Sequence, residues 1–345
     1  MDEASARTVL RELRVLRRLA GAPHVVQLID VVVPRGAGAV ALVFERRGMD
    51  MVVASQHRMF ATPELARECA WQLLTGLRAM HKRGVVHRDL TPRNVLVDDR
   101  AGDGTFALEI CDLGCAATAD ANLVNDYVVT RWYRAPELCG AFFPLQHADM
   151  QAVDVWAAAC IIAEAAAGGR VLFPGRDARQ QLKLALAVTG MPGPGQLCRA
   201  KPGALHNLFT FRTTSPGAPA PEALPVALKA AMGEAGVDLL MGMLRLDPRD
   251  RPSVDDTLAH PYFRGRPLPP LSATGGSAGR RVSFAFEHME PSIELMRILT
   301  EREDAANANA SANQAGGAGG RRRTRSADDD YRQLKHILPG LVEGA

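Results

Sequence analysis

Two short polar motifs near the middle of the chain hold the residue types that phosphoryl transfer requires. The first reads His-Arg-Asp at 87–89 and is followed by Asn94, and the second reads Asp-Leu-Gly at 112–114. Because a phosphoryl group is anionic, its transfer needs hard oxygen ligands that hold Mg²⁺ and a carboxylate that orients the attacking hydroxyl. Asp89, Asn94 and Asp112 supply these groups, so the motifs predict a phosphoryl-transfer site.

The order of the motifs is more specific than either motif alone. The second motif begins eighteen residues after Asn94, and Ala-Pro-Glu follows at 135–137. Simpler interpretations stay open for three residues in or outside these motifs. His87 is also explained as a core histidine, Cys111 as a packed residue, and Asp154 as a cap on the backbone of the first motif.

Two helices and a hairpin are predicted around these motifs. Residues 8–20 place Val9, Leu13, Leu16 and Ala20 on one face, and residues 64–82 place Leu65, Cys69, Leu73, Leu77 and Met80 on another. Thr62 and Pro63 are suited to the start of the second helix. The aliphatic runs 25–33 and 40–45 indicate a hairpin, because Pro34-Arg35-Gly36 separates them.

Composition limits the classes of partner that the chain is expected to have. The chain has 345 residues, 47% of them hydrophobic, a net charge of +3 and a pI near 8.6, which demand neither a nucleic acid nor a membrane as partner. The N-terminus has no apolar signal core, and the most apolar run, 153–167, is too short to span a bilayer. We therefore expect a soluble intracellular protein, cytoplasmic and/or nuclear. Six cysteines without paired spacing are expected to be reduced and mostly buried: Cys69, Cys111, Cys115, Cys139, Cys160 and Cys198.

Over residues 1 to about 263 the chain resembles the protein kinases, most of all the mitogen-activated protein kinases and their cyclin-dependent relatives. The motifs TRWYRAPEL (130–138), AVDVWAAACIIAE (152–164), LFPGRD (172–177) and LAHPYF (258–263) carry the resemblance, together with those above. It implies an α+β fold with two lobes. The expected parts are a truncated small lobe (1–47), a mainly helical large lobe (48–263), a C-terminal extension that packs on the kinase (264–303) and a disordered tail (304–345).

The resemblance assigns a role to each candidate site residue. Asp89 would be the catalytic base, and Asn94 and Asp112 the Mg²⁺ ligands. The nucleotide ATP would be bound through the following residues: Glu12, which pairs with the ATP-binding lysine, Phe44 as gatekeeper, Glu45, Arg46 and Arg47 as hinge, and Leu96 under the adenine. Leu16, Leu28, His87 and Leu113 would align the lobes. Glu137 and Arg251 would form a buried ion pair, and Asp154 would hold the catalytic loop.

Two departures from the family pattern affect the site. The strands that should precede Glu12, with their glycine-rich loop and lysine, are not in the sequence, and we expect it to be a piece of a longer chain; the alternative is that Met1 is the true start. The lysine expected two residues after Asp89 is Thr91. We hypothesise that Arg93 supplies the missing positive charge beside the phosphate, and the alternative is that Arg93 only faces solvent.

The activation segment and the residues after 263 also differ from those of the relatives. Asn125-Asp126-Tyr127 replaces Thr-x-Tyr, so Tyr127 would be the regulatory site, phosphorylated by an upstream dual-specificity kinase. Arg88, Thr130, Arg131 and Arg134 are the other expected regulatory residues. Arg131 and Arg134 would pair with the phosphorylated tyrosine, and the alternative is that these two arginines only pack the loop. The acidic docking patch expected after residue 263 is missing, and RRRTRS at 321–326 is either a targeting or phosphorylation signal or a solvated tail.

These observations favour a serine/threonine kinase that phosphorylates protein substrates, preferring hydroxyls followed by proline. The alternative from another class is a pseudokinase, a scaffold that binds partners without phosphoryl transfer. It would follow if Met1 is the true start, because the phosphate loop and its lysine would then not exist. Retention of Asp89, Asn94 and Asp112 speaks for catalysis.

Overall fold

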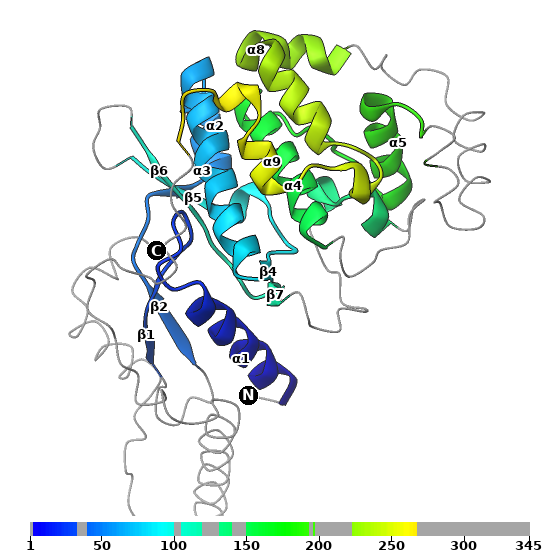
Figure 1. Ribbon diagram of the computed structural model, residues 1–345. Coiled ribbons are helices and arrows are strands. Elements are labelled where there is room, and N and C mark those ends of the chain that lie inside the picture. The colour runs from blue at the N-terminus through cyan, green and yellow to red at the C-terminus, as the bar shows by residue number, and fades with distance from the viewer. Residues whose placement is uncertain are drawn as a thin grey trace, which may run out of the picture. The chain divides into compact units, whose positions relative to one another are not determined.

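The computed structural model describes residues 3–32, 40–99, 105–118, 131–139, 150–192, 196 and 223–267. Helices and small antiparallel sheets alternate within these ranges, which is the α+β class expected from the sequence (Figure 1). The chain divides into two compact units, Met1–Ile293 and Glu294–Ala345, and every described residue belongs to the first. The predicted extension beyond residue 267 and the predicted tail lie outside the described residues.

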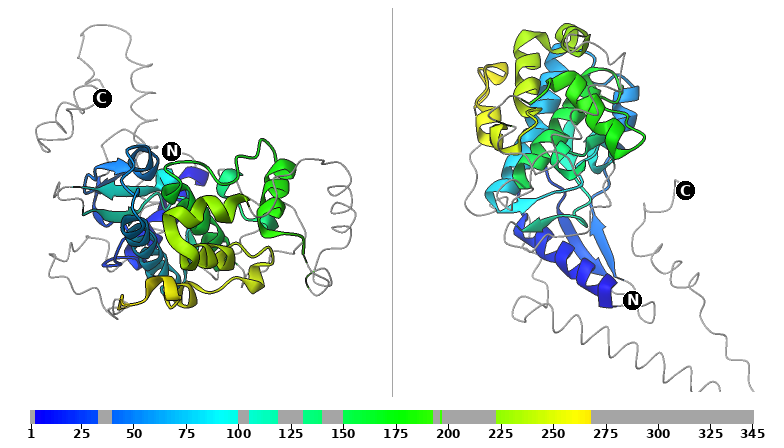
Figure 2. Two further views of the ribbon diagram at one scale, coloured as in Figure 1. Left: turned by 90° about the horizontal axis from the view of Figure 1, so that it is seen from above. Right: turned by 90° about the vertical axis from the view of Figure 1, so that its right-hand side faces the viewer.

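The N-terminal part consists of helix α1 (Glu3–Arg18) and two strands, β1 (Leu28–Val32) and β2 (Ala41–Phe44), which lie together at one end of the described residues (Figure 2). The strands pair antiparallel, as the predicted hairpin requires. The predicted helix end at residue 20 was wrong. The chain turns at residues 19–21, where Gly21 has φ 70°, and leaves Ala20 exposed while Leu16 is buried.

The first part of the predicted strand 25–33 pairs elsewhere. Val25 forms a parallel bridge with Ile110, and its neighbour Val26 donates its N–H to the Ile110 carbonyl at 3.0 Å. The Ile110 N–H in turn donates to the His24 carbonyl at 2.9 Å. These bonds join the segment between α1 and β1 to the strand that leads directly into Asp112.

Helix α3 (Pro63–Lys82) is the long helix that the sequence predicts. Its N-cap is Thr62, whose hydroxyl accepts the Leu65 N–H at 3.3 Å, and Pro63 occupies the first turn. Gly76 is required midway along it, because a Cβ there would lie 2.6 Å from the His24 carbonyl oxygen. The helix therefore begins and packs where local sequence indicates.

Short strands bring the two polar motifs together. β5 (Val95–Asp98) lies between β3 (Met49–Asp50) and β6 (Ala107–Ile110) in a three-stranded antiparallel sheet. β4 (Val85–Val86) pairs with β7 (Ala117–Thr118). Because the first motif runs from β4 towards β5 and the second from β6 towards β7, both motif loops lie beside these two ladders.

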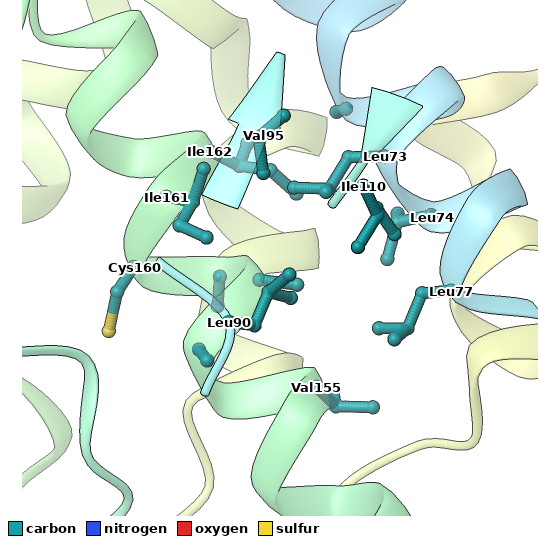
Figure 3. Close-up of a cluster of buried hydrophobic side chains, with 14 of the residues drawn as sticks. Leu73, Leu74, Leu77, Leu90, Val95, Ile110, Val155, Cys160, Ile161 and Ile162 are labelled. Atoms are coloured by element: carbon teal, nitrogen blue, oxygen red, sulfur yellow. The ribbon is translucent and has the colours of Figure 1, made fainter. Parts of the chain in front are cut away.

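Helix α4 (Met150–Ala166) is the buried core helix predicted from its apolar run. Its side chains face those of α3 across a continuous cluster that strands β5 and β6 close (Figure 3). The labelled members of this cluster are Leu73, Leu74, Leu77, Leu90, Val95, Ile110, Val155, Cys160, Ile161 and Ile162. Among the described helices none is both long and apolar enough to cross a membrane.

The remaining elements complete the large part of the fold around α3 and α4. The α-helices are α2 (Met51–Gln56), α5 (Ala178–Thr189), α8 (Ala223–Met243) and α9 (Val254–Leu258). The 3₁₀ turns are η1 (Pro92–Asn94), η2 (Arg131–Tyr133), η3 (Pro136–Cys139), η5 (Pro248–Asp250) and η6 (Pro261–Phe263). α8 is kinked at Gly233, whose φ of 71° and ψ of 178° are not helical.

Candidate active site

The backbone of the first motif is held from below by one buried carboxylate on α4. Asp154 accepts the N–H of His87 at 2.8 Å and the N–H of Arg88 at 2.9 Å, and it lies 2.9 Å from the His81 Nε2. Burial opposes ionisation of Asp154, but its hydrogen bonds to the two histidines outweigh burial and lower its pKa. Asp154 thus acts as a fixed anion that orients the loop and not as a second base.

His87 links the two motif loops. Its Nε2 lies 3.0 Å from the Cys111 carbonyl oxygen, and its Nδ1 lies 3.3 Å from the Asp89 N–H. A carbonyl oxygen only accepts and an N–H only donates, so Nε2 carries the proton in a neutral ring. The fully buried His87 therefore spans from the loop of Asp89 to the strand end that precedes Asp112.

Asn94 connects the candidate base to the candidate metal ligands. Its Nδ2 donates to the Asp89 carbonyl at 2.9 Å, which leaves Oδ1 as the end of the amide able to contact a cation. The Cys111 N–H donates to the Asn94 carbonyl at 2.9 Å. Asp89, Asn94 and the residue before Asp112 are therefore tied together by two hydrogen bonds, and the structure brings the three predicted residues to one place.

The side of the site formed by α1 carries negative charge. A Cβ at Gly114 would lie 3.4 Å from Asp112 Oδ1 and 3.8 Å from Glu12 Oε2, so both carboxylates border the same glycine. Burial is the largest cause that raises the pKa of Glu12, and the negative charge of Asp112 is the second. The positive charge of Arg11 lowers this pKa. Among the described residues no lysine pairs with Glu12. The carboxylates of Glu12 and Asp112 thus repel each other, and a bound cation would relieve this repulsion.

The predicted hinge residues are placed between β2 and β3. Phe44 and Glu45 are exposed, and Leu96 is half-buried on β5, opposite Asp50. The Arg47 guanidinium is engaged with acids of the sheet: Nε donates to Glu109 Oε2 at 2.7 Å, and Nη1 lies 3.7 Å from Asp98 and 3.3 Å from Glu45. Any contact of Arg47 with a nucleotide in this arrangement would come from its backbone.

Thr91 and Arg93 differ in what they offer to a phosphate. Thr91 is buried and neutral, so it cannot replace the charge of the expected lysine. The Arg93 side chain is 76% exposed, and its Nη1 lies 3.9 Å from Asp50 Oδ2. Arg93 is therefore free to move towards a ligand, and its exposure is equally what the solvent-facing alternative predicts.

The turn that follows the activation segment is anchored by buried charges. Arg251 donates two hydrogen bonds of 2.7 Å to Glu137, and further ones to backbone carbonyls of Ala152 and Leu246. Its guanidinium also lies 5.0 Å from the Trp156 ring centre. The Glu137 and Arg251 side chains are fully buried, which suits a structural role.

The predicted regulatory residues are only partly described. Arg88 is buried, Arg134 is half-buried, and Arg131 is exposed and donates to the Arg176 carbonyl. Tyr127 and Thr130 lie outside the described residues, so their predicted regulation stays a prediction.

Several polar contacts in the site were not foreseen from the sequence. Tyr133 donates to the buried Glu164 at 2.7 Å, His81 contacts Asp154, and Arg47 contacts Glu109. Each joins residues far apart in the chain, and no local pattern announces them. The expectation of mostly buried cysteines was wrong for Cys115, which is exposed, while Cys111 and Cys139 are half-buried and Cys198 lies outside the described residues.

A metal ion in this site would be held by an amide oxygen together with a carboxylate. The described ranges contain no group of three or more His, Cys, Asp and Glu side chains that could hold an ion. Mg²⁺ bound to a nucleotide typically takes only one or two carboxylates, with phosphate and water oxygens completing its shell. The amide oxygen of Asn94 and the carboxylate of Asp112 have this chemistry, and the residues present therefore fit such an ion.

Comparison with known proteins decides the family. The family model described as protein kinase domain matches residues 1–263. The chain belongs to the protein kinase family. The kinase is 33% identical over 322 residues to mitogen-activated protein kinase 9 of Arabidopsis thaliana, an alignment that covers 87% of this chain and 57% of the relative. It is 36% identical over 309 residues to mitogen-activated protein kinase 14 of Oryza sativa subsp. japonica, covering 87% and 54%.

These relatives confirm the resemblance to mitogen-activated protein kinases that the motifs indicated. The kinase is also 36% identical over 312 residues to mitogen-activated protein kinase 8 of Arabidopsis thaliana, covering 87% of the chain and 50% of the relative. The chain spans about half the length of the curated relatives that it matches.

Proposed function

We propose that this protein is a serine/threonine protein kinase of intracellular signalling, which transfers the γ-phosphate of ATP to protein hydroxyls. The observation that carries the proposal is the pair of hydrogen bonds on Asn94, one to the Asp89 carbonyl and one from the Cys111 N–H. They hold together a carboxylate that can accept the proton of the substrate hydroxyl and two oxygen ligands for a metal ion.

The chain's own residues would divide the work as follows. Asp89 orients the attacking hydroxyl and accepts its proton, while Asp154 keeps the loop of Asp89 in place through the backbone. Asn94 and Asp112 would hold Mg²⁺, which would supply positive charge to offset that of the phosphate. Glu45, Arg46 and Arg47 would border the adenine, with Phe44 as gatekeeper and Leu96 beneath the ring.

Arg93 would supply positive charge near the transferred phosphate in place of the lysine that Thr91 replaces. Its exposed guanidinium lies 3.9 Å from the Asp50 carboxylate, which is too long for a strong hydrogen bond. Swinging away from Asp50 would therefore cost little. If the rate of transfer by an Arg93→Ala variant stays within about twofold of the wild type, this role is wrong, since such a contact is worth about tenfold or more.

The finer features of the function rest on the sequence alone, through the family resemblance and the composition. Substrates would be proteins with a hydroxyl followed by proline, Tyr127 would be phosphorylated by an upstream dual-specificity kinase, and the protein would act in the cytoplasm and/or nucleus without nucleic acid or membrane. The scaffold alternative gains nothing from the relatives, whose names are those of kinases.

The test is transfer of labelled phosphate from ATP to a serine-proline peptide, with Asp89→Asn as the matched variant. Asparagine keeps the size of the side chain and the backbone carbonyl that Asn94 contacts, so the loop should fold unchanged. We expect transfer to fall by about 10²-fold or more, while binding of Mg²⁺-ATP measured by calorimetry is retained. Equal transfer by both proteins would refute the role of Asp89. Failure of the wild type to bind Mg²⁺-ATP would instead favour the scaffold.

A further inference from the structure

A hollow lies where the ends of α2 and α4 meet the first half of α8. Its volume is about 430 Å³, within the range of small-molecule sites. A side chain on Gly169, just after α4, would lie 3.6 Å from the Cβ of Ser55 in α2, so the two helix ends are in contact. Described residues that line it include Arg58, Ala163, Ala167, Arg170, Leu228 and Ala231.

The lining combines two cations with an otherwise aliphatic wall. Arg58 and Arg170 are exposed, and all the other lining side chains are those of alanine, glycine, valine or leucine. Among the residues that the structure describes, no carboxylate lines the hollow. Arg58 lies three residues after Ser55 and Arg170 directly after Gly169, so the guanidiniums extend from neighbouring points of the backbone. The end of α4 contributes partial negative charge, roughly half an elementary charge, which two full cations exceed.

Arg58 occupies a position that its backbone does not favour. Its φ is 57°, and it ends α2 with the two bonds of a Schellman motif, Arg58 N–H to Ser55 C=O at 3.0 Å and Met59 N–H to Ala54 C=O at 3.1 Å. Glycine is the usual residue there, because the Cβ of any other residue is crowded in this conformation. Gly168, which ends α4 in the same hollow, does have a positive φ of 67°. An arginine held at such a place points to a use for its side chain.

We propose that the hollow binds a small amphipathic anion, an acyl chain that ends in a carboxylate or phosphate. Arg58 and Arg170 line the same hollow, and guanidiniums bind such a head group with charge-assisted hydrogen bonds. Apart from the two arginines, the described lining side chains are aliphatic, which matches a chain of methylene groups. They offer no hydrogen-bond partner to a peptide backbone, whose burial without hydrogen bonds is unfavourable. The wall therefore favours an acyl chain over a peptide segment as the occupant.

The test is calorimetric titration of the full chain with dodecanoate and with dodecyl phosphate, below the concentrations at which they aggregate. We expect saturable binding of either or both, weakened about tenfold or more by Arg58→Gly and by Arg170→Gln. Dodecanol, which lacks the charge, should bind at least tenfold more weakly. Ala167→Phe, which fills the exposed part of the wall, should also abolish binding.

Arg58→Gly separates binding from folding, because glycine suits the conformation of residue 58 and should leave the melting temperature unchanged or raise it. Arg14→Gln, which removes an exposed arginine of α1, is the matched control and should bind as the wild type does. The proposal would be overturned by absence of saturable binding to the wild type, by equal binding of dodecanol, or by equal loss in Arg14→Gln.

Discussion

Two carboxyl groups beside the catalytic residues have pKa values that are shifted in opposite directions. Asp154 on α4 is completely buried, yet three groups hydrogen-bond to it and its pKa is lowered. Glu12 on α1 is less buried, yet burial and the nearby Asp112 raise its pKa. The partners of Asp154 come from the chain itself, whereas the charges on the α1 side lack a lysine within the described residues.

The difference indicates which part of the site is formed by the large lobe alone. The hydrogen bonds that hold the loop of Asp89 come from Asp154 on α4, from Asn94 and from the Cys111 carbonyl, all of them in the large lobe. The carboxylates on the α1 side instead form a region where added positive charge would be stabilising. The first side is therefore complete without a ligand, and the second is arranged to receive a cation.

The largest effect is expected for Arg251→Met, which changes a residue that contacts the backbone of α4. The substitution leaves the fully buried Glu137 carboxylate without its charged partner, which should lower the free energy of unfolding by about 3–5 kcal/mol. Urea unfolding measures this loss. The control is Lys229→Met, which removes an exposed ion pair with Glu234 and should change nothing measurable. Similar losses in both variants would show that the α4 side does not depend on its buried charges.

A slightly smaller loss, about 2–4 kcal/mol, is expected for Asp154→Asn. The amide cannot accept both N–H groups of the loop as the carboxylate does, so one donor loses its partner. Transfer activity should fall with stability, because the loop of Asp89 is no longer fixed. Asp238→Asn, which removes an exposed acid beside His260, is the control and should be close to neutral.

The contribution of Asp154 to the free energy of unfolding should change with pH in one direction. The pKa of Asp154 in the folded protein lies below its ordinary value of 3.8. The unfolded chain therefore takes up this proton first, and the stabilisation by Asp154 is complete above that value and lost as the pH falls through the folded pKa. Unfolding followed between pH 6 and pH 3 should show a steeper acid loss in the wild type than in Asp154→Asn. Parallel curves would contradict the lowered pKa.

Local sequence was sufficient for the parts of the fold that depend on local interactions. Helix α3 begins at Pro63 after its Thr62 cap, as its sequence predicts, because capping and periodicity act within a few residues. The strand predicted from residue 25 was wrong at its start, since Val25 pairs with Ile110 across a long stretch of chain. A run of valines indicates a strand but does not specify its partner.

In the site, too, local sequence predicted some features, and long-range contacts determined the others. The order of the motifs predicted that Asp89, Asn94 and Asp112 would meet, since strand pairing places their loops together. The contacts between His81 and Asp154, 73 residues apart, and between Arg47 and Glu109, 62 residues apart, had no local pattern to predict them. Long-range polar partners depend on packing that only the folded chain defines.

The smallest effect is expected on the α1 side and should have the opposite direction. Glu12→Gln removes a carboxylate that burial and Asp112 disfavour, so the free energy of unfolding at pH 7 should rise, by no more than about 1 kcal/mol because the group is partly exposed. The folded pKa lies above the ordinary 4.5, so the wild type becomes less stable as the pH rises through that window, and the variant should not. Urea unfolding at pH 4.5 and pH 7 measures the difference.

Asp112→Asn separates the two causes of this effect. If the charge of Asp112 contributes, Glu12→Gln should stabilise the Asp112→Asn protein less than the wild type, and the difference measures the repulsion between the carboxylates. Equal gains in both backgrounds would leave burial as the whole cause. A loss of stability in Glu12→Gln would mean that Glu12 already has a cationic partner, and the contrast between the α1 side and the α4 side would then be wrong.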